Sequence, residues 1–260
     1  MKLKAPRKSF DSVRVKADTR ADVRGVNLTA VGGACAVLTA AWFVVGIVLM
    51  ASSGVQTLIP DTGADNLKWI DDVDSGGDLF IAGAWLGILG GVFGLIALVC
   101  VYDTFRSAGP LMILAPVLAV VAWALVTISH LIPIAMANEL VPGYVGAHGS
   151  TQDSLTVVSN TLAQTSLVIN YTGDVLLWGV VVPMYAFAIL RTRLIAGWIG
   201  WVGIVTAVFA GWLGLLSPLS SVIDGITFLG FVAFFVFMAS MGIALLRREA
   251  ATTQPAAVAR

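Results

Sequence analysis

The residues with the clearest capacity for chemistry stand close together in one stretch of the chain. Ser166, Asn170 and Asp174 are spaced four residues apart, so they share one face of a helix, and Tyr171 lies one position from that face. A carboxylate, an amide, a hydroxyl and a phenol arranged in this way can hold a cation or a polar head group through charge and hydrogen bonds.

Two more ionisable residues, His130 and Asp224, stand inside otherwise apolar stretches. Counting about 1.5 Å per helical residue from the far end of each stretch places Asp174 about 25 Å, His130 about 33 Å and Asp224 about 34 Å along its helix. A membrane core is roughly 30 Å thick, so all three fall near the same boundary. We predict that they line a ligand-binding pocket there, together with Asn170 and Tyr171. The alternative is that the three ionisable side chains reach the interface separately.

The sequence carries no recognised catalytic or cofactor-binding motif. HExxH, CxxC, GxSxG and a Walker lysine are all absent, and His130 and His148 are not at metal-ligand spacing. The run DDVDSGGD at Asp71–Asp78 weakly resembles a calcium-binding loop, but Gly83 stands where such a loop needs its bidentate glutamate. We therefore predict no catalytic residue, no metal and no cofactor, and we expect Asp71–Asp78 to form a turn at the membrane interface.

Six long apolar stretches must position these residues. Of the 260 residues, 58% are hydrophobic and only 12% are charged, and the charges cluster between uncharged runs. A helix of roughly 20 apolar residues crosses the hydrocarbon and satisfies its own backbone hydrogen bonds there. We predict an all-α fold, a bundle of six transmembrane helices within a membrane domain of residues 26–248. The expected spans are residues 28–51, 79–102, 110–138, 168–190, 194–217 and 225–246.

The fourth span is preceded by an unusually polar stretch, Leu155–Gly173, which contains Asn160, Thr161, Gln164 and Thr165. A polar helix cannot face lipid at low cost. We expect this stretch either to extend beyond the membrane or to line a water-filled vestibule.

The lysines and arginines fix the expected orientation. Eight precede the first span, and Arg106, Arg191, Arg193, Arg247, Arg248 and Arg260 follow the even-numbered spans. Lys68 alone falls in an odd-numbered connection, so 14 of the 15 basic residues lie on one side of a six-span arrangement. The positive-inside rule makes that side cytoplasmic. We therefore predict a multi-pass protein of the cell membrane with both termini in the cytoplasm.

The two tails are expected to be unstructured. Residues 1–25 form a basic tail that we expect to be disordered and to contact anionic lipid head groups. It has no aromatic interleaving and no recognisable nucleic-acid-binding module, so no nucleic-acid partner is predicted. Residues 249–260 are expected to form a second cytoplasmic tail.

Small residues recur at four-residue spacing in several spans, for example Gly83, Gly87 and Gly91. Helices in lipid associate through close backbone approach at such stripes. We expect them to hold a compact bundle, and they could also contact a second protomer or a partner membrane protein.

The carboxyl-terminal third resembles a known family. The segments RTRLIAGWIGWVGIVTAVFAGWLGL and GFVAFFVFMASMGIALLRR, within Arg191–Arg248, are similar to the end of bacterial membrane proteins of domain-of-unknown-function family 4386. The resemblance implies six spans and a short basic turn before a fifth span rich in glycine and tryptophan. Gly197 stands before Trp198 where the family often has proline. The family implies a fold, without an established activity or catalytic residues.

Three functions remain open from the sequence. The first is a non-catalytic binding, sensing or accessory membrane component. The second is a carrier or channel for a small solute or ion, although no ionisable residue is expected near the membrane midplane. The third is an intramembrane enzyme acting on lipid, for which Asp174, Asp224 and His130 are the available acid–base groups.

Overall fold

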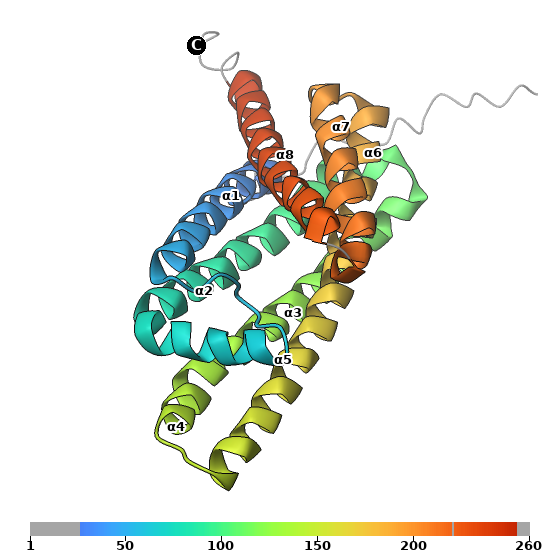
Figure 1. Ribbon diagram of the computed structural model, residues 1–260. Coiled ribbons are helices and arrows are strands. Elements are labelled where there is room, and N and C mark those ends of the chain that lie inside the picture. Colours follow the sequence, from blue (N-terminus) through green and yellow to red (C-terminus); the bar gives the residue numbers. More distant parts are fainter. Residues whose placement is uncertain (1–26, 220, 254–260) are drawn as a thin grey trace, which may run out of the picture.

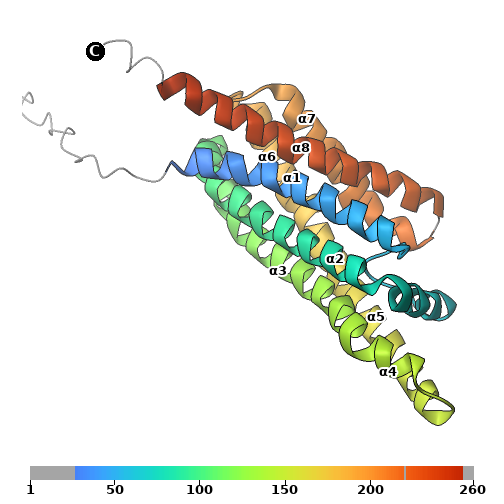
Figure 2. The ribbon, with the colours of Figure 1, turned by 90° about the vertical axis from the view of Figure 1, so that its left-hand side faces the viewer.

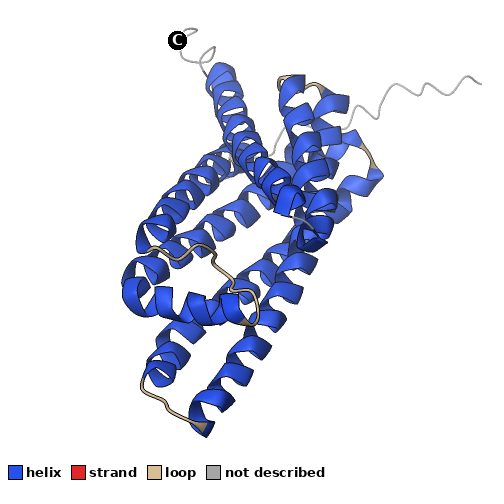
Figure 3. Cartoon of the chain, viewed as in Figure 1, coloured by secondary structure: helices blue, strands red, loops and turns tan. Residues whose placement is uncertain are grey.

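The computed structural model describes the backbone of residues 27–219 and 221–253, and the side chains of these residues except 217–219, 221, 222, 224, 252 and 253. The predicted basic tail, residues 1–25, and most of the second tail lie outside the described residues. The described part is helical with no strand (Figure 3).

Most of the helices follow one another in the sequence with only short connections between them. Their bounds are α1 Leu28–Ser53, α2 Ala64–Phe105, α3 Leu114–Ala135, α4 Val141–Val145, α5 Ser150–Leu176, α6 Val182–Thr192, α7 Gly197–Thr206 and α8 Ser221–Thr253. Three π-helical segments continue α3, α5 and α7, and these are η3 Met136–Leu140, η4 Leu177–Val181 and η5 Ala207–Trp212. The short 3-10 segments are η1 Arg106–Ala108, η2 Pro110–Ile113 and η6 Leu213–Leu219.

Six helices in the described chain are long and apolar enough to cross a membrane when they are followed through their bulges. This confirms the predicted all-α fold of six transmembrane helices and identifies an integral membrane protein. Each predicted span lies within or largely overlaps one of the six helices, but several helices are longer than predicted. For example, α2 begins at Ala64 rather than near residue 79.

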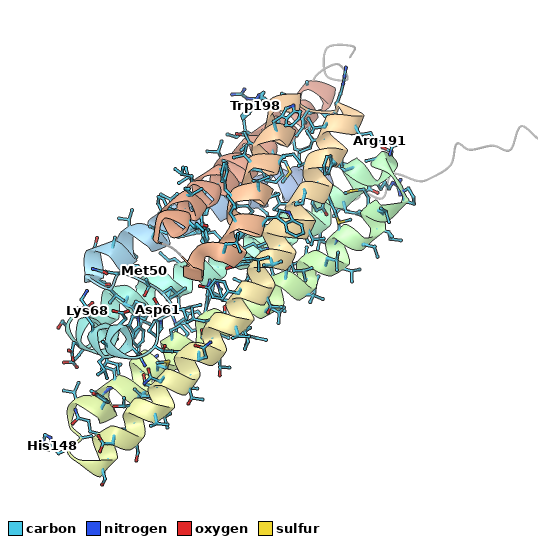
Figure 4. The ribbon with its side chains drawn as sticks, turned by 45° about the vertical axis from the view of Figure 1, so that its right-hand side comes forward. Met50, Asp61, Lys68, His148, Arg191 and Trp198 are labelled. Atoms are coloured by element: carbon cyan, nitrogen blue, oxygen red, sulfur yellow. The ribbon has the colours of Figure 1, made fainter. Side chains whose placement is uncertain are left out.

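The bundle has two distinct ends. At the end that we call basic, Gly109 lies beside Arg191, and Arg247 lies near the start of α7. Figure 4 shows Arg191 and Trp198 at this end, with Asp61, Lys68 and His148 at the opposite, acidic end. Arg106 and Arg191 therefore share one end, as a six-span arrangement requires.

Neighbouring helices pair in a simple pattern. Helix α1 packs against α2 and α8, α3 packs against α5, and α7 packs against α6 and α8 (Figures 1 and 2). In Figure 1 the short helix α4 and the start of α5 project beyond the rest of the bundle. The polar stretch Leu155–Gly173 is thus part of one continuous helix, and its outer portion contacts the first part of α2 through Ser159 and Asn160.

Glycines make the closest helix contacts. Gly33 on α1 faces the carbonyl oxygen of Gly242 on α8, and Gly83 on α2 faces that of Gly46 on α1. Gly211 in η5 lies against the backbone of Gly179 in η4. The absence of a side chain at these glycines lets two backbones approach closely. The contacts described here all join helices of the same chain.

Two of the π-helical segments have a cause in the sequence. A proline has no N–H and its ring clashes with the carbonyl group four residues earlier. Pro142 stands four residues after Asn138 in η3, and Pro183 stands four residues after Gly179 in η4. Widening the helix to π geometry at these points relieves the clash, and such bulges recur at functional sites.

Two local predictions are wrong. Asp71–Asp78 is not a turn: it lies within α2, which bends at Gly76, where φ is −124° and ψ is 16°. Lys68 and Asp72 on the same helix form an ion pair at 3.8 Å, and their spacing of four residues supports the helix. The second tail is also not wholly unstructured, because α8 continues to Thr253, and Glu249 accepts a hydrogen bond from Asn27 at 2.7 Å.

Candidate functional site

A cavity of about 370 Å³ lies in the half of the bundle next to the acidic end. Met50, which lines it, lies near Asp61 and Lys68 in Figure 4. Helices α1, α2, α3, α5 and α8, the segment η4 and the connection between α1 and α2 all contribute to its wall. Its lining residues include Phe43, Ile47, Met50, Thr57, Leu58, Ile59, Gly87, Trp123, His130, Asn170, Tyr171, Asp174, Trp178, Phe231, Phe234 and Phe235.

Aromatic rings form much of the wall. Phe43 lies with its centroid 6.1 Å from that of Trp123 and 5.6 Å from that of Phe235. Trp178 meets Phe231 edge to face at 4.3 Å. Rings from α1, α3, η4 and α8 therefore surround the space, and such a wall favours an apolar or cationic guest.

One side of the cavity is polar. The Asn170 side-chain amide donates to Asp174 Oδ2 at 2.5 Å, and the Ser129 hydroxyl lies 3.0 Å from Asn170 Oδ1. His130 also faces Asn170. Asp174 is only 8% exposed, and the described residues provide Oδ1 with no hydrogen bond. The arrangement orients Asn170 so that its N–H group, rather than its oxygen, meets the carboxylate.

Ser166 has a different role. Its hydroxyl donates to the Ser129 carbonyl oxygen at 2.6 Å, and the side chain is fully buried between α5 and α3. This hydrogen bond therefore links α5 to α3 close to Asn170 and Ser129, and Ser166 does not line the cavity.

Two aromatic residues of the wall carry unsatisfied donors. The indole Nε1 atoms of Trp123 and Trp178 are buried, and neither has a hydrogen-bond partner among the described residues. Most buried polar groups in proteins are paired, and an unpaired one costs about 1–3 kcal/mol. The rings themselves line the cavity, but these two indole nitrogens are buried within the protein rather than open to the space.

The connection between α1 and α2 closes the cavity toward the acidic end. Thr57, Leu58 and Ile59 line the space from this side. The Trp69 indole donates to the Thr57 carbonyl oxygen at 3.1 Å, which fixes the loop against α2. Asn66 on α2 exchanges hydrogen bonds of 2.8 and 3.1 Å with Ser159 on α5, so the first part of α2 is held as well.

A groove of about 510 Å³ lies beside the cavity, between α1 and α8. It shares Ile47, Met50, Phe231 and Phe235 with the cavity wall. Figure 1 shows α1 and α8 crossing near the basic end and separating toward the acidic end. The cavity is therefore flanked by a lateral opening that faces the apolar exterior of the bundle.

The structure brings four of the five predicted site residues to one cavity. These are His130, Asn170, Tyr171 and Asp174. The fifth, Asp224, belongs to α8, and its side chain lies outside the described residues.

Sequence reasoning missed the aromatic wall and the closing loop, which is the connection between α1 and α2 that contains Thr57, Leu58 and Ile59. Phe43, Trp123 and Trp178 stand in uniformly apolar spans, where a ring facing lipid and a ring facing the interior look alike. The small-residue spacing of α2 was a usable signal, since Gly91 and Gly94 make room for the Trp123 ring.

The fold and the cavity define the class: an integral membrane protein of six helices that encloses a partly polar, partly aromatic space in one half of its bundle. Comparisons with protein-family models, with curated proteins and with solved structures found no match to this chain.

Proposed function

We propose that this protein is a non-catalytic binding or sensing component of the membrane, and that it binds an amphipathic molecule in its cavity. The observation that carries the proposal is one space with aromatic walls and a single polar side formed by His130, Asn170 and Asp174. Ligand pockets commonly combine a mostly apolar lining with a few convergent polar groups. The apolar part of the ligand would lie among the rings, and its polar part would meet Asp174.

The proposal includes an orientation. The basic end faces the cytoplasm by the positive-inside rule, which places the cavity in the outer half of the cell membrane. The groove between α1 and α8 then offers a route from the outer leaflet. Contact of the basic tail with anionic lipid, and membership of family 4386, are parts of the same proposal and support no particular ligand.

A carrier is the second candidate, and the π-helical segments favour it. Segments η4 and η5 meet at Gly179 and Gly211, next to the cavity residue Trp178, where a change of helix register could open a path. Against it, the basic half is filled: Phe105, Tyr185 and Phe237 are fully buried, and the Tyr185 hydroxyl donates to the Leu98 carbonyl oxygen. Binding without transport therefore fits the packing better.

An enzyme acting on lipid has less support. General acid–base chemistry on a lipid needs a nucleophile or a paired acid and base. Among the described cavity residues Asp174 is the sole carboxylate, and Asn170 stands between it and His130.

Photolabelling in lipid nanodiscs tests the proposal. The probe is a twelve-carbon alcohol with a diazirine on its chain, and the labelled residues are mapped by mass spectrometry. Trp123 and Trp178 are 3% and 7% exposed, so their labelling reports occupancy of the cavity rather than contact with surrounding lipid. We expect labelling at both residues, and we expect unlabelled alcohol to compete.

Two glycine variants provide the matched control. A side chain at Gly87 would meet nothing within 4 Å and would enter the cavity, whereas one at Gly225 is equally unhindered but lies on the exposed face of α8. Gly87→Leu should abolish the labelling of Trp123 and Trp178, and Gly225→Leu should preserve it. Equal labelling in both variants would exclude the cavity as the binding site.

A further inference from the structure

We propose that the ligand is an organic cation, an alkylammonium with an apolar tail, whose ammonium group pairs with the Asp174 carboxylate. This inference rests on the proposed function and names its ligand class. It follows from the charges, the ring positions and the access route of the cavity.

The first argument concerns charge. The Asp174 side chain is only 8% exposed, and its one described hydrogen bond comes from the neutral Asn170 amide. A buried carboxylate is costly without an opposite charge nearby. No lysine or arginine is among the described residues of the cavity wall. A cationic ligand would supply the missing charge and a donor for Asp174 Oδ1.

The same inventory argues against an anionic ligand. A fatty acid or a phosphate head group needs a basic partner, and arginine or lysine usually supplies it. Among the described residues of the wall, the His130 imidazole can donate a hydrogen bond, but no lysine or arginine is present to balance an anion. An anionic head group would therefore bring its own uncompensated charge into a poorly solvated space, which is unfavourable.

The aromatic residues are placed to hold an ammonium group near the carboxylate. Tyr171 lies three residues before Asp174 and Trp178 four residues after it, so both lie on the same helix face. All three residues line the cavity, and Trp178 is packed edge to face against Phe231. A cation within about 6 Å of an aromatic centroid gains roughly 0.5–2 kcal/mol, with the larger values where water is excluded.

The remaining wall suits an alkyl tail. From the polar side, the cavity continues along Phe43 and Phe235 to Ile47 and Met50, the residues it shares with the lateral groove. An amphipathic cation could therefore place its head at Asp174 while its tail points toward the opening between α1 and α8. Its approach would be from the bilayer, where such molecules concentrate.

Competition against the diazirine alcohol distinguishes the ligand classes. The competitors are dodecylamine, dodecanol and dodecanoate, which share one chain length and differ in head-group charge at neutral pH. The nanodiscs contain phosphatidylcholine, which has no net charge and does not concentrate the amine. We expect dodecylamine to displace the probe from Trp123 and Trp178 at a concentration about tenfold lower than dodecanol, and dodecanoate to be the weakest.

Asp174→Asn preserves the shape and removes the charge. In this variant the advantage of dodecylamine over dodecanol should fall to less than about twofold, while dodecanol itself competes as before. A purely structural role of Asp174 would weaken all competitors alike and would not change their ranking. Gel filtration establishes that the variant is folded, and the ranking in the wild type decides the question if it is not.

The outcomes separate the two proposals. Equal competition by amine and alcohol in the wild type, or an amine advantage that survives Asp174→Asn, would overturn the ligand class while leaving cavity binding intact. Labelling that persists in Gly87→Leu would overturn cavity binding itself. Loss of the amine advantage in Asp174→Asn, with labelling abolished by Gly87→Leu, would support both.

Discussion

The half of the bundle next to the basic end is filled with side chains, whereas the half next to the acidic end encloses a cavity. In the filled half, α1 and α8 touch at Gly33 and Gly242, and Tyr185, Phe105 and Phe237 are buried between the helices. In the hollow half the same two helices have separated, and Met50 and Phe231 border an open groove.

The difference shows how one pair of helices can serve two purposes. Close backbone contact holds helices together in lipid, where apolar burial gives no net drive for association. Once the glycine contact fixes α1 to α8 at one end, their crossing forces them apart at the other. The cavity is therefore a geometric consequence of firm packing elsewhere, and its polar groups occupy a space that the packing keeps open.

The same substitution, glycine to alanine, probes both halves and the bend of α2 at the acidic end. The largest effect is expected in the filled half. In Gly242→Ala the new Cβ would meet the Gly33 carbonyl oxygen and lie about 3.0 Å from Val37 N, which are backbone atoms that cannot move aside. We expect a loss of about 2–3 kcal/mol in the free energy of unfolding.

This change is measured by thermal or denaturant unfolding of the purified protein in detergent. Gly225→Ala is the control on the same helix, because its Cβ meets nothing within 4 Å. An unchanged unfolding midpoint in Gly242→Ala would mean that the contact between α1 and α8 does not hold the filled half together.

An intermediate effect is expected at Gly76, where α2 bends. The end of α1 approaches this glycine so closely that a Cβ would clash with the Ser53 carbonyl group. Gly76→Ala should therefore displace the start of α2 from α1 and cost about 1–2 kcal/mol. Gly77→Ala, with open space around its Cβ, is the matched control.

The bend also determines whether the cavity stays closed. Since the first part of α2 holds the closing loop through Trp69 and Thr57, its displacement should expose that loop. We expect faster proteolysis between residues 54 and 63 in Gly76→Ala than in Gly77→Ala. Equal rates would show that the closing loop is stable without the bend.

The sequence was sufficient to predict the six membrane-spanning helices, because hydrocarbon imposes a single rule on all of them. Charged residues are excluded over a fixed length. That rule locates apolar spans, but it does not say where a helix ends once it has left the membrane. Helix α2 continues through Asp71–Asp78, since water-exposed acidic residues are compatible with helix geometry. The turn predicted there was wrong for this reason.

The polar part of the candidate site could be predicted from the sequence, whereas its aromatic part could not. The i, i+4 spacing of Asn170 and Asp174 predicts a shared face, and the hydrogen bond between them at 2.5 Å follows from it. Helix length places His130 at a similar depth on another helix. The rings of Phe43 and Trp178 could not be assigned to the interior, because lipid and protein core favour the same apolar side chains. Their role as ligand contacts stays a prediction.

The smallest effect, and one of opposite sign, is expected in the hollow half. A Cβ at Gly87 would meet nothing within 4 Å, although this glycine belongs to the same stripe as Gly83, whose Cβ would clash with the Gly46 carbonyl oxygen at 2.8 Å. Gly87→Ala should therefore keep the packing intact and gain about 0.5–1 kcal/mol from the better helix propensity of alanine. Unfolding under the conditions used for Gly242→Ala measures this gain. If Gly87→Ala were as destabilising as Gly83→Ala, the space beside α2 would close in the folded protein, and the division of the bundle into a filled and a hollow half would be wrong.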